Sequence, residues 1–178
     1  MLTLHRLTSS SHPLFSWIEE LIETSFPIEE RRDVTKQRKL IDENENFYCN
    51  VIEEDGKAIG VINYWQLDDF YYLEHFATDP TLRNGGYGSK TLELLRKSVD
   101  KPIILEAEEP LDEMSRRRIG FYQRQGFTLQ ETPYLQPPYR EGDDFLPLKL
   151  MTWGNIDMEQ HSDRVISLIH RIAYGMKE

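Results

Sequence analysis

Three glycines within four residues are the feature of this sequence with the clearest chemical potential. Gly85, Gly86 and Gly88 follow Arg83-Asn84, and an amphipathic segment starts directly behind them. Glycine lets the backbone approach a ligand closely. The first turn of a helix offers backbone N–H groups at the positive end of the helix dipole. This combination is typical of an anion site, and above all of a site for a diphosphate.

Two common phosphate loops do not fit these residues. A Walker-type loop needs Gly, four spacers and then Gly-Lys-Ser/Thr, but Lys90-Thr91 follows Ser89, and the other glycine position is Asn84. A dinucleotide fingerprint beginning Gly86-x-Gly88 needs a third glycine where Thr91 stands. Both alternatives are therefore excluded by the residues themselves.

The remaining pattern, Arg83-x-x-Gly86-x-Gly88, resembles the acetyl-CoA loop of the GNAT superfamily of N-acetyltransferases. A second segment from Arg118 to Phe127, RIGFYQRQGF, is similar to a later motif of that superfamily, in which a helix ends in Phe-Tyr-x-x-x-Gly-Phe and leads into a strand. The two motifs occur in the superfamily's order, and the resemblance extends from Leu2 to Met151.

This resemblance implies a fold and an activity. The fold is α/β (α+β), with a central, mixed, mostly antiparallel twisted sheet of about six or seven strands flanked by helices. The activity is transfer of acetyl from acetyl-CoA to a primary amine, on a small molecule, a peptide N-terminus or a lysine, by direct attack in a ternary complex. No metal is implied. A non-catalytic sensor or interaction module that binds acetyl-CoA or CoA is the alternative.

The resemblance also implies cofactor contacts. The backbone of Phe76 to Thr78 is expected to run beside pantetheine like an added strand, which requires the neighbouring strand at Pro102 to Glu106 to diverge. Ser115 stands where many members of the superfamily have Asn. The expected cofactor-binding residues are Phe76, Ala77, Thr78, Arg83, Asn84, Gly85, Gly86, Tyr87, Gly88, Ser89 and Ser115.

Glu74 and Tyr122 are the expected catalytic residues. The resemblance implies that Glu74, at a position where several members of the superfamily have an acidic residue, is a base that acts directly or through water, or an anchor for the cationic amine. A structural role is the alternative. Tyr122 is expected to donate a proton to the departing thiolate, with aromatic core packing as the alternative. Strand alternation places His75 on the opposite face from Glu74, which favours a packed histidine. Cys49 is expected to be a small buried hydrophobe.

Composition limits the remaining function classes. The chain has 178 residues and a net charge of −10, without a basic arm, which disfavours nucleic acid or an anionic membrane as partner. It contains one cysteine, and no apolar stretch approaches the length of a membrane span. We expect a cytoplasmic enzyme with one acetyltransferase domain at residues 1–152 and a C-terminal extension at 153–178.

Periodicity predicts alternating strands and helices. Helices are expected from Leu14 to the break at Pro27, over Glu29–Glu43, behind the glycine loop with Leu92, Leu95 and Val99 inward, and over Leu111–Gln125. The expected strands are Leu2–Leu7, Phe47–Glu54, Lys57–Trp65, Phe70–Thr78, Pro102–Glu106, Phe127–Glu131 and Leu146–Met151.

The C-terminal extension carries an apolar stripe at helical spacing, formed by Val165, Leu168, Ile169, Ile172 and Ala173. This additional helix is expected to pack on its own domain or to form a subunit contact in a homodimer. The acceptor itself cannot be named from the sequence. Acidic residues from Glu106 to Glu113 suit a cationic amine and are equally typical of a solvated surface.

Overall fold

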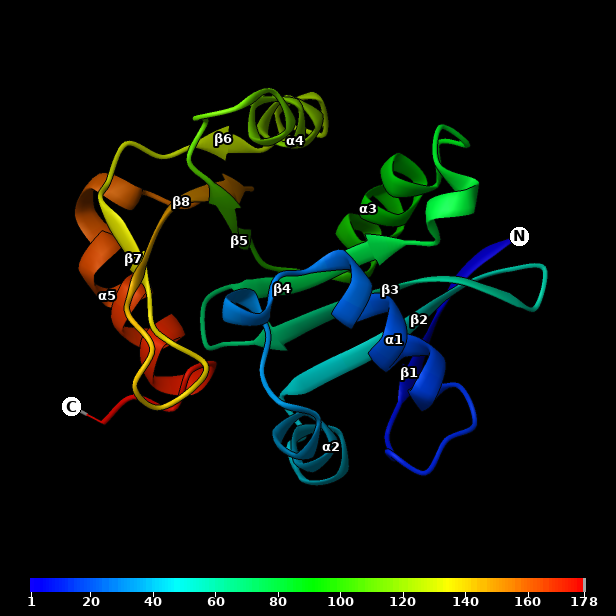
Figure 1. Cartoon of the computed structure of the whole chain (residues 1–178). Coiled ribbons are helices and arrows are strands. Elements are labelled where there is room, and N and C mark those ends of the chain that lie inside the picture. Colours follow the sequence, from blue (N-terminus) through cyan, green and yellow to red (C-terminus); the bar gives the residue numbers. More distant parts are fainter. Residues whose placement is uncertain (178) are drawn as a thin grey trace. The chain divides into compact units, whose positions relative to one another are not determined.

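The computed structural model describes residues 1–177, and the chain divides into two compact units (Figure 1). The first unit comprises Met1–Gln66 and Leu73–Asp100, and the second comprises Leu67–Tyr72 and Lys101–Glu178. Strand β4, Tyr71–Thr78, starts in the second unit and continues into the first.

Antiparallel strands form the framework of the first unit. β1 (Leu2–Leu7) pairs with β2 (Phe47–Glu54), and β2 pairs with β3 (Lys57–Gln66). Asp55 and Gly56 connect β2 to β3 with positive φ angles of 50° and 78°, the geometry of a tight hairpin turn. β4 follows β3 in the hydrogen-bonded strand order. The predicted hairpin is therefore confirmed.

The helices of the first unit differ from the prediction at one place. Helix α1 spans Phe15–Ser25 and buries Phe15, Ile18, Leu21 and Ile22. The single helix predicted over Glu29–Glu43 is wrong, because a 3₁₀ turn, η1 (Ile28–Glu30), is followed by a separate helix α2 (Val34–Glu43). Asp33 explains the break. Its backbone is extended, and its side chain accepts a hydrogen bond from the backbone N–H of Lys36, so it caps a new helix.

The glycine loop lies between the 3₁₀ turn η2 (Pro80–Leu82) and helix α3 (Tyr87–Ser98). Thr91, Leu92 and Leu95 form the buried face of α3. Val99, expected on that face, is instead the half-buried C-cap of the helix.

Strand β8 is the centre of the second unit. β5 (Ile103–Glu108), β6 (Thr128–Leu129) and β7 (Tyr134–Gln136) each pair antiparallel with β8 (Leu146–Trp153). The strand predicted over Phe127–Glu131 is thus only two residues long. β7 was not expected, because prolines on both sides of this short segment are typical of a loop.

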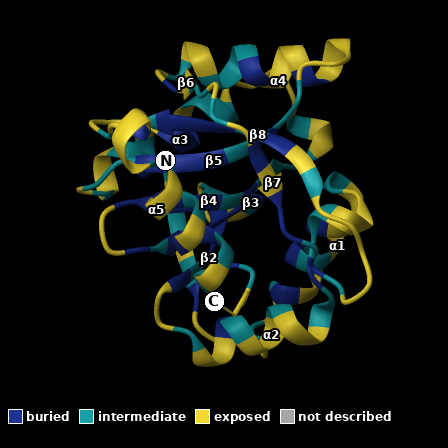
Figure 2. Ribbon diagram, turned by 90° about the vertical axis from the view of Figure 1, so that its left-hand side faces the viewer, coloured by how far each residue is buried: buried dark blue, intermediate teal, exposed yellow. Residues whose placement is uncertain are grey.

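Two helices complete the second unit. Helix α4 (Glu113–Arg124) buries Ser115 and Ile119 and leaves most of its surface exposed, whereas β5 is largely buried (Figure 2). Helix α5 (Met158–Ile172) confirms the predicted C-terminal helix and buries Met158, Val165, Leu168 and Ile169. It packs within its own unit, since His170 Nε2 donates to the carbonyl of Leu135 at 3.0 Å. A subunit contact stays a prediction.

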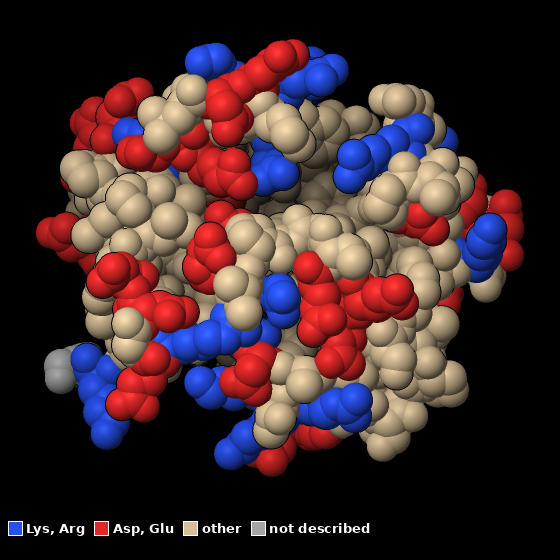
Figure 3. Space-filling model, in the orientation of Figure 1, with Lys and Arg blue, Asp and Glu red and all other residues tan. Residues whose placement is uncertain are grey.

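The predicted fold class is confirmed: residues 1–177 form a mixed α/β structure with eight strands flanked by helices. Acidic and basic side chains are interspersed on the face drawn in Figure 3. Among residues 1–177, none of the helices has the length and apolar character that a membrane span requires. The expected cellular location stays a prediction.

Candidate active site

The glycine loop ends at a helix N-terminus that has no side-chain cap among residues 1–177. Gly86 is the N-cap of α3 and adopts a left-handed conformation with φ 73° and ψ 7°. No side chain caps this end, and the first turn contains no acidic residue. A Cβ atom built on Gly86 would meet no heavy atom within 4 Å among the described residues outside its chain neighbours and its own helix backbone. The space beside the first turn of α3 is therefore open to a ligand, and the positive end of the helix dipole favours an anion there.

Neighbouring residues shape the loop. A Cβ atom at Gly85 would lie 2.8 Å from the ring of Tyr87 and 3.2 Å from the carbonyl oxygen of Leu82, so a side chain there would displace the Tyr87 ring. Asn84 also has a positive φ, 68°. Arg83 is exposed, and the Lys90 ammonium lies 5.4 Å from the centroid of the Tyr87 ring. The loop and the first turn of α3 thus carry backbone donors and two cationic side chains, Arg83 before the loop and Lys90 in the helix.

Glu74 lies on β4 in the same unit and is held by a guanidinium. Arg32 Nη1 donates to Glu74 Oε2 at 2.8 Å, and Arg32 Nη2 donates to Oε1, which makes the pair bidentate. The two side chains are only 5% and 0% exposed. Trp65 Nε1 adds a longer contact of 3.4 Å to Oε2. Glu74 is therefore an enclosed, fixed carboxylate, and sequence spacing gave no sign of its partner.

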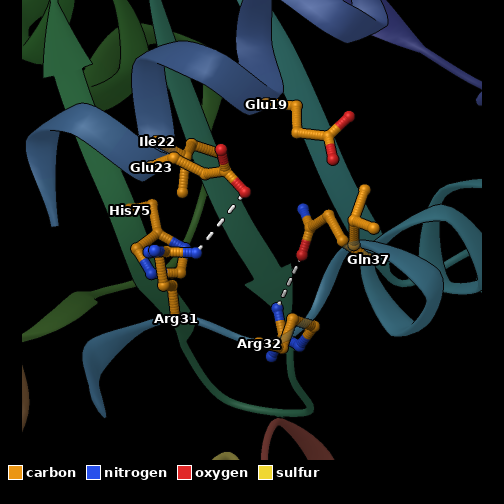
Figure 4. Close-up of a pocket in the computed structure, with 8 residues that line it drawn as sticks. Glu19, Ile22, Glu23, Arg31, Arg32, Gln37 and His75 are labelled. Carbon is orange, nitrogen blue, oxygen red and sulfur yellow. Dashed lines mark hydrogen bonds and ion pairs between the residues drawn. The ribbon is translucent and has the colours of Figure 1, made fainter. Parts of the chain in front are cut away.

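A small cavity of about 20 Å³ borders Arg32 and is large enough for roughly one water molecule. Figure 4 shows Arg31 directed toward Glu23, at 3.6 Å, and Arg32 directed toward Gln37, at 3.0 Å. The amide nitrogen of Gln37 is buried and has no hydrogen-bond partner within the described chain. Acidic and basic side chains thus both line this cavity.

His75 lines the same cavity and is buried, as its strand position suggests. Its Nε2 donates to the carbonyl of Glu30 at 2.8 Å, and its ring packs 4.7 Å from that of Phe26. Burial lowers the pKa of His75, although the charge of Glu74 and the bond to Glu30 oppose this shift. The imidazole is consequently neutral at pH 7.

Tyr122 lies in the last turn of α4, in the second unit. Its ring packs between Phe121 and Phe127, with centroid distances of 5.3 and 5.6 Å. Desolvation raises the pKa of the Tyr122 phenol to about 12, against a smaller lowering by the charge of Arg118. Gly126 ends the helix with φ 89°, a conformation that favours glycine and explains its place in the motif.

A cluster of phenols around Glu106 was not foreseen. Tyr134 donates to Glu106, and the Tyr174 hydroxyl lies 2.9 and 2.8 Å from the two carboxylate oxygens. The hydroxyls of Tyr72 and Tyr139 lie 3.1 and 3.5 Å from that of Tyr174. The sequence showed tyrosines and an acidic stretch, but their convergence depends on tertiary structure.

Comparison with known proteins settles the family. The family model "Acetyltransferase (GNAT) family" matches residues 11–127, which is more than half of the chain. The chain belongs to the GNAT acetyltransferase family. A search of curated proteins found no match.

Solved structures agree with this assignment. A protein from Bacteroides thetaiotaomicron assigned to the GNAT acetyltransferases is 50% identical, with a TM-score of 0.94, covering 98% of this chain and 99% of that one. The ribosomal-protein-S18-alanine N-acetyltransferase of Escherichia coli shares the fold at 19% identity and a TM-score of 0.57, covering 86% and 93%. A GNAT acetyltransferase from Elizabethkingia anophelis with acetyl-CoA bound shares it at 15% identity and 0.55, covering 86% and 98%.

In this GNAT protein the expected site residues are distributed over both units. The first unit carries Glu74, the half-buried residues Phe76–Thr78 and the loop Arg83–Ser89. The second carries Ser115 and Tyr122.

The Ser115 hydroxyl is occupied by its own helix. Ser115 and Asp112 form a capping box at the start of α4, and the hydroxyl bonds to Asp112 Oδ1 at 2.9 Å. This hydroxyl would have to leave the cap, at least in part, to contact a cofactor.

Cys49 is fully buried on β2, and desolvation raises the pKa of its thiol to about 12. A buried thiol that stays protonated is a poor nucleophile. The GNAT protein therefore offers no reactive thiolate at this position for an acyl-enzyme.

Proposed function

We propose that the protein is an acetyl-CoA-dependent N-acetyltransferase that acetylates a primary amine by direct attack in a ternary complex. The observation that carries this proposal is the uncovered N-terminus of α3, where Gly86 leaves open space beside backbone N–H donors. Arg83–Ser89 would hold the diphosphate, and the backbone of Phe76–Thr78 would bind the pantetheine. Acetyl-CoA is the acetyl donor and co-substrate.

Tyr122 is proposed to stabilise the departing thiolate by donating a hydrogen bond. A phenol with a pKa of about 12 is protonated at neutral pH and can therefore donate. Complete proton transfer to a thiolate, whose conjugate acid has a pKa near 8.5, would be uphill. We therefore assign Tyr122 the electrostatic part of leaving-group stabilisation and leave final protonation to solvent.

Glu74 is proposed to serve the acceptor amine, as a base through water or as an anchor. The ion pair with Arg32 constrains both roles, because it must loosen before the carboxylate can take up a proton. The same ion pair is the specific observation that favours the alternative function, a CoA-binding sensor without turnover. In a sensor, Glu74 would only fix Arg32 and the segment between η1 and α2.

The amine class is left broad. The E. coli relative in fold is named for an alanine of a ribosomal protein, and the superfamily resemblance also allows small amines. Small-molecule amines and peptide N-termini or lysines are therefore the acceptors to test.

The test is calorimetric titration with acetyl-CoA, followed by measurement of CoA thiol release with spermidine, tyramine, kanamycin, lysine and a peptide with N-terminal alanine. Tight binding with amine-dependent release supports the enzyme. Binding without release above the no-amine rate favours the sensor. An absence of binding would overturn the assignment of the glycine loop.

A further inference from the structure

The second unit contains a cavity of about 370 Å³ that none of the expected catalytic or cofactor-binding residues lines. Its walls come from three segments: the turn before β4, the start of β5, and residues 155–168, which reach from the end of β8 into α5. The third segment lies outside the residues matched by the family model and supplies most of the lining. Small-molecule sites typically have volumes of roughly 300–1,000 Å³. The cavity therefore has the size of a ligand site.

Apolar side chains form the inner wall of this cavity. Phe70, Val165 and Leu168 are buried, with exposed fractions of 1%, 3% and 7%. Pro102 and Ile156 are half-buried and continue the apolar surface toward solvent. An apolar group that leaves water for such a wall gains free energy in proportion to the area that it buries. The wall thus favours a ligand with an apolar body.

The exposed residues of the lining are polar. Asp69 and Arg164 form an ion pair whose side chains are 53% and 58% exposed. An exposed ion pair of this kind is weak, because water screens it, so a charged ligand can compete for either partner. Asn155 and His161 are also exposed. The apolar wall is therefore bordered by groups that can bind the charged end of a ligand.

The carboxylate of Asp157 indicates which charge the cavity favours. Asp157 is the N-cap of α5, and its Oδ1 accepts hydrogen bonds from the backbone N–H groups of Glu159 and Gln160 at 3.0 and 3.1 Å. These bonds occupy two of the donors with which a helix N-terminus attracts an anion. They also leave Oδ2 of Asp157 to a ligand. With Asp69, the lining carries two carboxylates against the single guanidinium of Arg164, so a cation complements it.

We infer that this cavity binds a primary amine carried on a short apolar body, a ligand of the size of phenethylamine. The ammonium group contacts the carboxylates of Asp157 and Asp69. The apolar body lies against Phe70, Val165 and Leu168. This site goes beyond the proposed acetyl transfer and does not depend on it.

Methyl NMR spectra of the whole chain locate the ligand directly. Titration with phenethylamine, without acetyl-CoA, should shift the methyl signals of Ile156, Val165 and Leu168 and saturate at about millimolar concentration. A salt concentration of about 150 mM screens the general attraction of a chain with net charge −10 for cations. Two matched probes should produce no saturable shift in the same range. Ethylamine keeps the ammonium without the ring, and 3-phenylpropionate carries a carboxylate in place of the ammonium.

Variants of the charged residues test where the ammonium binds. Asp157→Asn keeps a good N-cap residue and should weaken phenethylamine binding about two- to fivefold, the size of an exposed ion pair. Arg164→Gln frees Asp69 and should strengthen binding by a similar factor. Asp33→Asn is the matched control, because it removes the same charge from the N-cap of α2 in the first unit, and its affinity should equal that of the wild type. Thermal unfolding of each variant checks that it is folded.

An absence of shifts in these three methyl-bearing side chains up to about 10 mM phenethylamine would overturn the inference. Equal or tighter binding of 3-phenylpropionate would overturn it as well, because the cavity would then hold an anion through Arg164. Equal weakening in Asp157→Asn and Asp33→Asn would also overturn it, by attributing the affinity to the net charge of the chain. These titrations contain no acetyl-CoA and detect binding alone, so their outcome is separate from the amine-dependent CoA release that tests the proposed function.

Discussion

Replacement of Gly86 by alanine tests the proposed diphosphate site most directly. The residue has φ 73°, and an alanine there adopts a left-handed conformation that costs about 1–2 kcal/mol. For a chain of this size, that cost lowers Tm by roughly 2–8 °C. Apart from its chain neighbours and its own helix backbone, the new methyl group would meet no atom of the described chain within 4 Å, so it projects into the open space beside the first turn of α3.

Gly56→Ala is the matched control for backbone strain. Gly56 lies in the β2–β3 turn with φ 78°, and a Cβ atom there also meets nothing within 4 Å. Both variants should therefore lose similar stability in thermal unfolding. Only Gly86→Ala should lose affinity for acetyl-CoA, by about tenfold or more, because a disturbed N–H bond to a charged phosphate is worth about 1.5–3 kcal/mol.

Calorimetric titration of both variants with acetyl-CoA measures the difference. Equal affinity of Gly86→Ala and wild type would refute the reasoning, because the methyl group could not then lie where the diphosphate binds. Loss of affinity in Gly56→Ala as well would attribute the effect to stability instead.

Four further outcomes follow from the structure. Tyr122→Phe should lower kcat at least about tenfold with acetyl-CoA affinity retained, since it removes only the hydroxyl; unchanged kcat would remove its role in the reaction. Arg32→Met should destabilise the protein by about 3–5 kcal/mol in urea unfolding, because it leaves the Glu74 carboxylate buried without its guanidinium, and a loss below 1 kcal/mol would contradict that picture. Because burial lowers the pKa of His75 in the folded protein, the unfolded state binds a proton first as the pH falls, so the free energy of unfolding should be greatest above about pH 6.5 and decline below it. This decline should be less steep in His75→Asn. Burial also lowers the pKa of His170, which contributes in the same direction. Cys49→Ala should retain kcat within about twofold, and a large loss would reopen the question of an acyl-enzyme.

Local features were the part of this structure that the sequence could predict. The β2–β3 hairpin depends on Asp55-Gly56, and the turn into α3 depends on the positive φ of Gly86, so residue type alone indicates them. The interruption between η1 and α2 was missed although Asp33 is a good N-cap, because a charged run hides the apolar period that would mark the boundary.

The side-chain partners could not be predicted in the same way. Arg32 and Glu74 lie 42 residues apart, and Glu106 and Tyr174 lie 68 apart. No rule of sequence spacing predicts either contact, because each depends on how separate helices and strands pack together. The alternation of β4 indicated that His75 is packed in the core, but it did not reveal that the His75 ring lies near Glu74, with 3.9 Å between Nδ1 and Oε2.

The two carboxylates differ in what holds them, and this difference bears on the chemistry. Glu74 is held by a guanidinium, so a proton or an ammonium group competes with a bidentate cation for its oxygens. The hydroxyls that hold Glu106 orient its oxygens without adding charge. Uptake of a proton therefore displaces a cation at Glu74 but only reorganises hydrogen bonds at Glu106. For Glu74 to act as the proposed base, the ion pair with Arg32 must loosen, whereas a role as an anchor through Arg32 needs no such change.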